Sequence, residues 1–247
     1  MDLGLKGRTA IVCGASSGIG LAVAEALVAE GANVAMFARR RDVLQREADR
    51  LGALAVRGDV AVPADLERLV ERTVAAFGGV DILVNNGGGP PPGPAAGVTE
   101  EQIESAIALL LQSAVRLTNL CLPYLEQSGR GRVVNLESMT IREPLDNMVL
   151  SNLVRAAVAS WAKTLSREVA AKGITVNTVA TGKIDTDRLR SLFPGASPAD
   201  LAVGVPVGRI GRPSELAALV SFLASEQAGY ITGTVIPVDG GVGRSLL

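Results

Sequence analysis

Residues 9–20 read TAIVCGASSGIG, and this stretch decides the fold. Its first part, residues 9–13, is a short apolar run typical of a buried strand. Residues 18–30 place apolar side chains at helical spacing, and Gly31 follows as a C-terminal cap. A strand, a glycine-rich turn and a helix in direct succession are typical of a dinucleotide-binding α/β fold.

The glycine-rich turn predicts a site for a dinucleotide diphosphate. Glycines permit positive φ angles and a close approach of the backbone to a ligand. The start of the helix supplies unpaired N–H groups and the positive end of a dipole, and serine hydroxyls add donors. A plain tight turn is the alternative, but the position between strand and helix favours the site. Its predicted members are Gly14, Ser16, Ser17, Gly18, Ile19 and Gly20.

Strand-like runs and helical patterns alternate along the rest of the chain, with no linker or low-complexity break. Because parallel strands need crossover connections, this alternation predicts a parallel sheet covered by helices on both faces. We therefore expect an α/β fold, with a single doubly wound Rossmann-type domain over residues 1–247. The expected strands are 9–13, 34–37, 53–56, 80–84, 132–136, 174–179 and 234–238, and the expected helices are 18–30, 63–77, 99–125, 152–171 and 213–224.

Composition excludes several classes of function. The formal net charge is −1 and the basic residues are scattered, so no nucleic-acid surface is expected. Charged or amide side chains interrupt every long apolar stretch well short of the ~20 residues of a membrane span, and the first residues lack a signal-peptide pattern. Histidine is absent and only Cys13 and Cys121 are present, so neither a metal site nor a Ser-His triad is expected. These features predict a cytoplasmic protein with no membrane partner.

The end of the second strand bears on the choice of cofactor. Many NAD-binding folds place an acid there to hold the ribose 2′-hydroxyl. Here Ala38 is followed by Arg39, Arg40 and Arg41. Guanidinium groups bind phosphate through a planar fork, so this sequence favours a 2′-phosphate. We expect NADP(H) to be preferred and NAD(H) to be possible; a solvated basic turn is the alternative.

Further motifs follow at the ends of later strands: Asp59-Val60, Asn85-Asn86-Gly87-Gly88, Gly182-Lys183-Ile184-Asp185-Thr186 and Asp239-Gly240-Gly241. Together with the glycine-rich turn they resemble the short-chain dehydrogenase/reductase family, and within it the 3-oxoacyl-acyl-carrier-protein reductase type, over essentially the whole chain. The resemblance implies a sheet of seven strands and a homotetramer. It also implies that Asp59 and Val60 contact adenine, and that Asn86, Gly87, Gly88, Gly182, Ile184 and Thr186 bind the cofactor.

The family's proton-donating residues are largely replaced. The resemblance implies a catalytic Ser, a Tyr-x-x-x-Lys motif and an Asn on the preceding helix. In this sequence Ser138 matches the Ser, whereas Ser151, Arg155 and Leu110 stand at the Tyr, Lys and Asn positions. We therefore take Ser138, Ser151 and Arg155 as the candidate catalytic residues, with Arg155 also facing the cofactor ribose.

The replacements differ chemically from the family's residues. A guanidinium stays charged and cannot pass a proton, and a serine is a far weaker acid than tyrosine. Ser151 has the alternative role of a helix N-cap, and Ser138 that of satisfying local backbone groups. Lys183 is a candidate replacement donor or a solvated lysine, and Glu137 is expected in a salt bridge or cap.

The substrate side is predicted less sharply. Residues 87–94 contain three successive prolines that form either a stiff wall or a rigid connection. Residues 183–202 match the family's substrate lid, and Leu189, Leu192 and Phe193 suggest an apolar pocket. Two functions stay open: an NADP(H)-preferring oxidoreductase acting on a small carbonyl or alcohol, with the proton coming from a residue, the substrate or water, or a dinucleotide-binding pseudoenzyme with a regulatory or structural role.

Overall fold

The computed structural model describes residues 2–246, and its centre is a seven-stranded sheet with the strand order β3-β2-β1-β4-β5-β6-β7. Every neighbouring pair of strands is parallel, which confirms the predicted doubly wound α/β fold. The order reverses beside β1, between β1 and β4, and ligands of such sheets bind at that switch point. The strands are β1 (Thr9–Cys13), β2 (Asn33–Ala38), β3 (Leu54–Arg57), β4 (Ile82–Asn85), β5 (Arg132–Ser138), β6 (Thr175–Thr181) and β7 (Val235–Val238).

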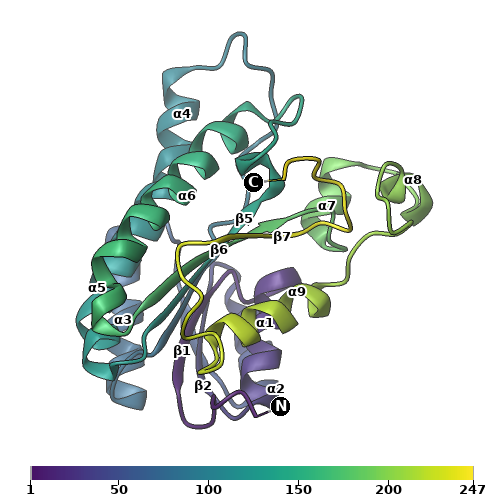
Figure 1. Cartoon of the computed structure of the whole chain (residues 1–247). Helices are drawn as coiled ribbons and strands as arrows, with labels where there is room; N and C mark the ends of the chain where they lie inside the picture. Colours follow the sequence, from purple (N-terminus) through teal and green to yellow (C-terminus); the bar gives the residue numbers. More distant parts are fainter. Residues whose placement is uncertain (1, 247) are drawn as a thin grey trace.

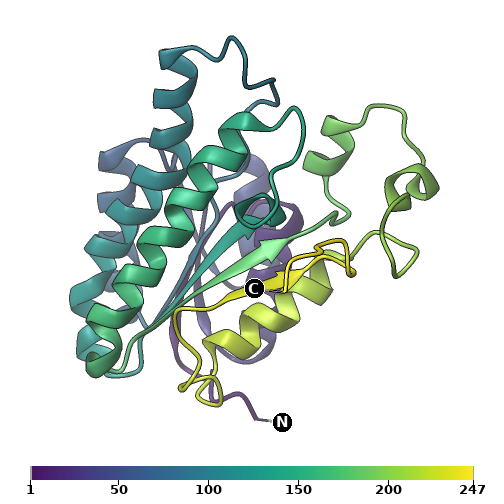
Figure 2. The same cartoon turned by 45° about the horizontal axis from the view of Figure 1, so that its top comes forward.

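Helices cover both faces of the sheet (Figures 1 and 2). One face carries α1 (Gly18–Ala29), α2 (Arg41–Leu51) and α9 (Pro213–Ala224). The other carries α3 (Pro63–Phe77), α5 (Ser113–Ser128) and α6 (Val149–Val169). The short helices α7 (Asp187–Leu192) and α8 (Pro198–Ala202) stand apart from both layers, beyond the carboxyl end of β6 (Figure 2).

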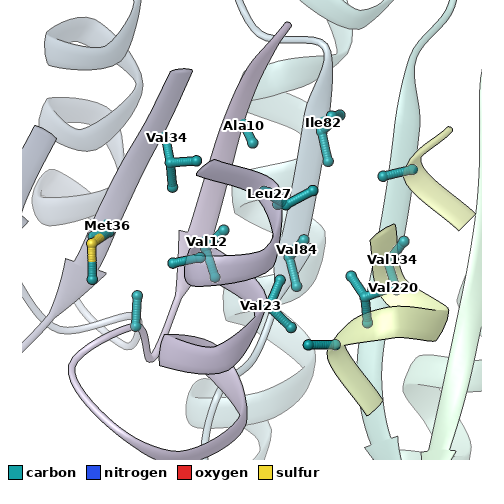
Figure 3. Close-up of a cluster of buried hydrophobic side chains, with 14 of the residues drawn as sticks. Ala10, Val12, Val23, Leu27, Val34, Met36, Ile82, Val84, Val134 and Val220 are labelled. Atoms are coloured by element: carbon teal, nitrogen blue, oxygen red, sulfur yellow. The ribbon is translucent and has the colours of Figure 1, made fainter. Parts of the chain in front are cut away.

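The central strands are buried on both faces. In β1, Ala10 and Val12 pack against Val23 and Leu27 of α1 (Figure 3), whereas Ile11 belongs to the cluster on the other side. This double burial explains why the run is continuously apolar and does not alternate with polar residues. The sheet is therefore a rigid platform whose carboxyl edge is free to carry a site.

Several predicted boundaries are confirmed. β1, α3 and α9 have the predicted limits, and Thr99 and Gln102 form the predicted capping box. Helix α1 ends at Ala29 with Glu30 as its C-cap, and Gly31 follows with a φ of 81°. Helix α2 was not predicted, because its sequence is mostly polar and only Leu44 and Ala48 are buried. The short helices α7 and α8 were also missed, since one turn and a half of helix leaves no clear apolar period.

The helix on either side of residue 110 is continuous but irregular. Helix α4 (Glu100–Ala106) runs through a π-helical turn at Ile107–Gln112 into α5. Glu100–Ser128 is the one helix among residues 2–246 that is long and apolar enough to cross a membrane by length and composition alone, a test that a buried core helix also passes. In the structure its residues Leu117, Cys121 and Leu125 are buried in the cluster that covers the sheet.

Candidate cofactor and active site

A cavity of about 660 Å³ lies at the carboxyl edge of the sheet, across the switch point between β1 and β4. One end is lined by the glycine-rich turn and the ends of β2 and β3, and the other by β5, α6 and the segment that follows β6. The cavity brings together most of the predicted residues: Gly14, Ser16, Ser17, Gly18, Ile19, Arg39, Arg40, Asp59, Val60, Asn86, Gly87, Gly88, Ser138, Ser151, Arg155, Gly182, Ile184 and Thr186. Gly20 is buried behind the lining.

The start of α1 has the geometry of an anion site. Gly14 and Gly18 have φ angles of 63° and 57°, in the left-handed region that favours glycine. Ser17 is the N-cap, yet its side chain accepts no bond from the helix, and the first turn contains no acid. A β-carbon on Gly20 would lie 2.4 Å from the Gly14 carbonyl oxygen. The N–H groups of this turn are thus left open toward the cavity, as a diphosphate requires.

Two of the three consecutive arginines reach this end of the cavity. The Arg40 Nη2 donates to Ser17 Oγ at 2.6 Å and to Ser16 Oγ at 3.3 Å. Arg39 is exposed, with its guanidinium 3.8 Å from the Asp59 carboxylate. Arg41 begins α2 and does not line the cavity. The geometry places two cations beside the end of β2, where a 2′-phosphate would need them.

The middle of the cavity is held by contacts between distant loops. Asn86 Nδ2 donates to the Cys13 carbonyl at 3.2 Å, and a β-carbon on Gly14 would lie 2.6 Å from that nitrogen. Thr186 caps α7 by accepting from the Leu189 N–H at 3.2 Å. These contacts set the floor of the cavity between its two ends.

The opposite end holds a chain of hydroxyl groups that leads to a guanidinium. Ser138 Oγ, at the end of β5, accepts from the Thr140 N–H at 3.3 Å. The Thr140 Oγ1 and Ser151 Oγ are 3.3 Å apart, and Ser151 Oγ accepts from Arg155 Nε at 3.2 Å. Ser151 borders the cavity but is only 2% exposed.

Arg155 is bound on several sides. Its Nη1 donates to Glu137 Oε2 at 2.7 Å and to the Leu136 carbonyl at 3.4 Å, and its Nη2 donates to the Gly88 carbonyl. Burial raises the pKa of Glu137, and the Arg155 guanidinium opposes that rise. The salt bridge expected for Glu137 is confirmed, and the charge of Arg155 is largely offset by its partner.

Lys183, Leu110 and both tyrosines lie outside the cavity wall. Lys183 does not line the cavity; its Nζ donates to the Val203 carbonyl at 3.0 Å. Tyr230 is fully exposed and, like Tyr124, is absent from the cavity wall. Leu110 is buried among apolar side chains of α4 and α6. No tyrosine or lysine therefore stands in for the family's proton donor in this cavity wall.

Two alternative readings from the sequence are corrected. Ser151 is not the N-cap of α6, because that helix begins at Val149 with Met148 as its N-cap. Phe193 does not line the pocket and is 48% exposed, although Leu189 and Leu192 do line it. Of the three successive prolines, only Pro90 borders the cavity.

Sequence reasoning missed several polar residues of the site, among them Thr140 and Arg188. Thr140 links Ser138 and Ser151, but a hydroxyl two residues beyond a strand end carries no distinctive signal. Arg188, on the first turn of α7, also lines the cavity. A single arginine in an irregular segment is ordinarily solvated, so its position could be found only from the fold.

A glycine-rich turn that opens a helix at the switch point of a parallel sheet defines a dinucleotide-binding protein of the Rossmann class. The family described as Enoyl-(Acyl carrier protein) reductase matches residues 14–243. The 3-oxoacyl-[acyl-carrier-protein] reductase FabG of Vibrio cholerae is 38% identical over 244 residues, covering 97% of this chain and 99% of its own. The protein of the same name from Escherichia coli K12 is 37% identical over 242 residues, with the same coverage.

Two solved structures of reductases are similar to this chain over nearly its whole length. L-Sorbose reductase from Gluconobacter frateurii, complexed with NADPH and L-sorbose, superposes with a TM-score of 0.93 at 35% identity over 100% of both chains. YwfH, an NADPH-dependent reductase involved in bacilysin biosynthesis, gives a TM-score of 0.93 at 28% identity over 97% of this chain and 99% of its own. The chain belongs to the short-chain dehydrogenase/reductase family.

Proposed function

We propose that this chain is an NADPH-dependent oxidoreductase that interconverts a carbonyl and an alcohol on a small molecule. One observation carries the proposal: a single cavity has an open helix N-terminus flanked by Arg39 and Arg40 at one end and the Ser138 hydroxyl at the other. The relatives are named as reductases, and the two similar structures are of reductases described as complexed with, or dependent on, NADPH.

The binding half of the site supports an NADP(H) preference. The N–H groups at the start of α1 would hold the diphosphate, and Asp59 with Val60 would border the adenine. Arg39 and Arg40 would hold the 2′-phosphate, which NAD(H) lacks, by charge-assisted hydrogen bonds. Asn86, Gly87, Gly88, Gly182, Ile184 and Thr186 would surround the nicotinamide half, with NAD(H) as a weaker alternative ligand.

The chain's own residues orient the substrate. When bound, the nicotinamide supplies or accepts a hydride. The Ser138 oxygen accepts from the Thr140 N–H, and its hydroxyl proton is bonded to no acceptor among residues 2–246. That proton is free to bond a substrate oxygen and to stabilise the charge that develops there. The Arg155 guanidinium holds Ser151 and Gly88 in place and has little donor capacity left for a ligand.

Proton transfer is the step that this site supports least. The Ser151 hydroxyl lies between Thr140 and Arg155, and a serine gives up its proton only at high pH. We infer that water reaching the open cavity supplies the proton in place of a tyrosine. A positioned general acid typically contributes ~10²–10⁴-fold to a rate, so turnover should be slower than in a complete site by a factor of that order.

A dinucleotide-binding pseudoenzyme is the second candidate, favoured by the buried Arg155–Glu137 pair. Arg155 stands at the family's lysine position, and four side-chain and backbone contacts fix its guanidinium. Such a pair stabilises a shape and does not move protons. On this account the chain senses or stores NADPH and regulates a partner.

One experiment separates the two candidates. NADPH and NADH are titrated by fluorescence, and NADPH oxidation is then followed on a panel of ketones, oxo acids and oxo esters. The same panel is run on the double variant Ser151→Tyr, Arg155→Lys, and on Ser138→Ala. The oxidoreductase predicts turnover by the unaltered chain that falls at least tenfold in Ser138→Ala with NADPH affinity unchanged.

Two other outcomes would contradict the oxidoreductase proposal. Tight NADPH binding with no turnover on any carbonyl, and turnover gained in the double variant, would establish the pseudoenzyme. Absence of binding to both dinucleotides would reject both candidates.

We further infer that residues 1–247 act as one domain in which residues 183–202, with α7 and α8, form a lid over the substrate. A cytoplasmic homotetramer with no nucleic-acid or membrane partner is in keeping with this family. Light scattering on the purified chain tests the tetramer, since a monomeric mass at micromolar concentration would reject it.

A further inference from the structure

Arg188 carries a positive charge that no acid of the described chain offsets. It lies on the first turn of α7 and lines the cavity beyond Ser138. Its Nη2 donates to the Pro90 carbonyl at 2.6 Å, and within residues 2–246 it forms no ion pair. The guanidinium is therefore anchored at one corner while its other N–H groups remain available.

The acids near Arg188 are already engaged. Glu137 is bonded to Arg155 at 2.7 Å, and Asp185 and Asp187 are bonded to Arg190 at 2.6 and 3.3 Å. Arg155 offsets Glu137, and Asp185 and Asp187 share the single guanidinium of Arg190, so none of these acids forms an ion pair with Arg188. Burial lowers the pKa of Arg188, and the charge of Arg155 lowers it further, so an anion placed here would relieve both effects.

The glycine at position 89 makes room for this guanidinium. A β-carbon on Gly89 would lie 2.8 Å from the Arg188 Nη2 and 2.9 Å from its Nε. Any larger residue would push the guanidinium away from the wall. The absence of a side chain at Gly89 therefore leaves the space that the Arg188 guanidinium occupies, although the two residues are far apart in the chain.

The remaining wall favours an acceptor over a donor in the ligand. The carbonyls of Gly88 and Pro90 are both taken up by arginine side chains. Proline offers no N–H, and Met148 and Leu192 are apolar. Arg188 and the Ser138 hydroxyl are the donors that this wall offers to a substrate.

We propose that the substrate carries a carboxylate that binds Arg188, with the reacting carbonyl directed toward Ser138. This rests on the proposed function, since it assigns the substrate class of the same site: oxo acids and the corresponding hydroxy acids. A guanidinium binds a carboxylate through two parallel hydrogen bonds, which fixes orientation as well as charge.

The test compares acids with their uncharged esters. 3-Oxobutanoate and 4-oxopentanoate are each assayed beside their methyl esters with saturating NADPH, and binding of the same four compounds to the NADP⁺ complex is measured by calorimetry. The variants are Arg188→Gln, which removes the charge, and Gly89→Ala, which displaces it. Arg188→Lys keeps the charge without the fork, and Lys172→Gln removes one charge from the opposite edge of the sheet, where Lys172 pairs with Glu126.

The unaltered chain should prefer at least one acid over its ester by tenfold or more in kcat/KM. Arg188→Gln should reduce kcat/KM for that acid by about 10- to 100-fold, the loss expected for a hydrogen-bonded charge, and leave the ester within about twofold. Gly89→Ala should reduce kcat/KM for the acid as Arg188→Gln does. Arg188→Lys should give a value between those of the unaltered chain and Arg188→Gln, and Lys172→Gln should give the value of the unaltered chain.

Three outcomes would overturn the proposal: esters used as well as acids by the unaltered chain, an equal loss on acid and ester in Arg188→Gln, or a weakened NADPH affinity in Arg188→Gln, which would assign the guanidinium to the cofactor. Calorimetry separates this from failure of the proposed function. Acid binding lost in Arg188→Gln without any turnover would support the carboxylate site and reject the reductase, whereas ester reduction without acid preference would do the reverse.

Discussion

The two ends of the cavity present different kinds of chemical group to a ligand. At the end near β1, the ligand-facing groups are mainly backbone N–H groups, placed by Gly14, Gly18 and the first turn of α1. At the end near β5, they are side chains: Ser138, Ser151 and Arg155, linked through Thr140. The geometry of the first end depends on the positions of its glycines, and that of the second depends on which side chains contact one another.

This difference sets how far each end of the cavity tolerates substitution. A backbone site allows little variation, since a β-carbon at Gly20 would collide with the Gly14 carbonyl. A side-chain network can be rebuilt if its members change together. Here an arginine at position 155 is accompanied by an acid at position 137, so the buried charge remains paired.

The largest expected effect comes from breaking that pair. Arg155→Met leaves Glu137 buried without its partner, and we expect a loss of about 3–5 kcal/mol in the free energy of unfolding. Replacing both residues with methionine should recover most of it, because a neutral apolar pair carries no uncompensated charge. Urea denaturation followed by circular dichroism measures both; equal stability of the single and double variants would contradict this account.

The pH dependence of Arg155→Met has a definite sign. Burial already raises the folded-state pKa of Glu137, and the variant removes the two Arg155 effects that lower it. A raised folded-state pKa gives stability that is fully present below the unfolded value, near 4.5, and is lost as the pH rises through the folded value. The variant should therefore be less destabilised at pH 5 than at pH 8, and the opposite trend would contradict the assignment.

The backbone end is tested by Gly20→Ala. The new β-carbon would lie 2.4 Å from a backbone oxygen that cannot move without reshaping the turn. We expect NADPH affinity, measured by fluorescence titration, to fall at least about 100-fold, which corresponds to ~2.7 kcal/mol. Gly79→Ala is the matched control, since a β-carbon there meets nothing within 4 Å. Similar affinities for the two variants would show that the turn does not hold the cofactor.

The smallest of these effects concerns cofactor choice. The double variant Arg39→Ala, Arg40→Ala should weaken NADPH binding by about 10- to 100-fold and change NADH binding by less than about threefold, because only NADPH carries the 2′-phosphate. Arg41→Ala, outside the cavity, should alter neither. Equal losses for both dinucleotides would place the arginines on the diphosphate instead.

The sequence was sufficient for the fold and for the backbone end of the site, because both leave local signals. Residues 9–20 alone predict a strand buried on both faces, followed by Gly14 and the start of a helix. The polar helix α2 and the short α7 leave weak signals, since few of their side chains are buried. Contacts between residues far apart in the chain leave no local sequence signal. Thr140 lies beside Ser151, and Arg188 beside Gly89, only in the folded chain. The roles of the individual site residues stay predictions.

The π-helical turn at Ile107–Gln112 has a consequence for how this chain tolerates change in length. Such a turn accommodates one residue more than the regular helix would need. Losing a single residue there would restore ordinary winding without turning α4 relative to α5, because the wide turn already absorbs the extra ~100° of rotation. The side of α4 that packs on α6 through Ala106 would stay in place. Gly87 lies against this turn, and a β-carbon there would be 2.6 Å from the Leu109 oxygen, so a one-residue deletion would instead change a wall of the cavity.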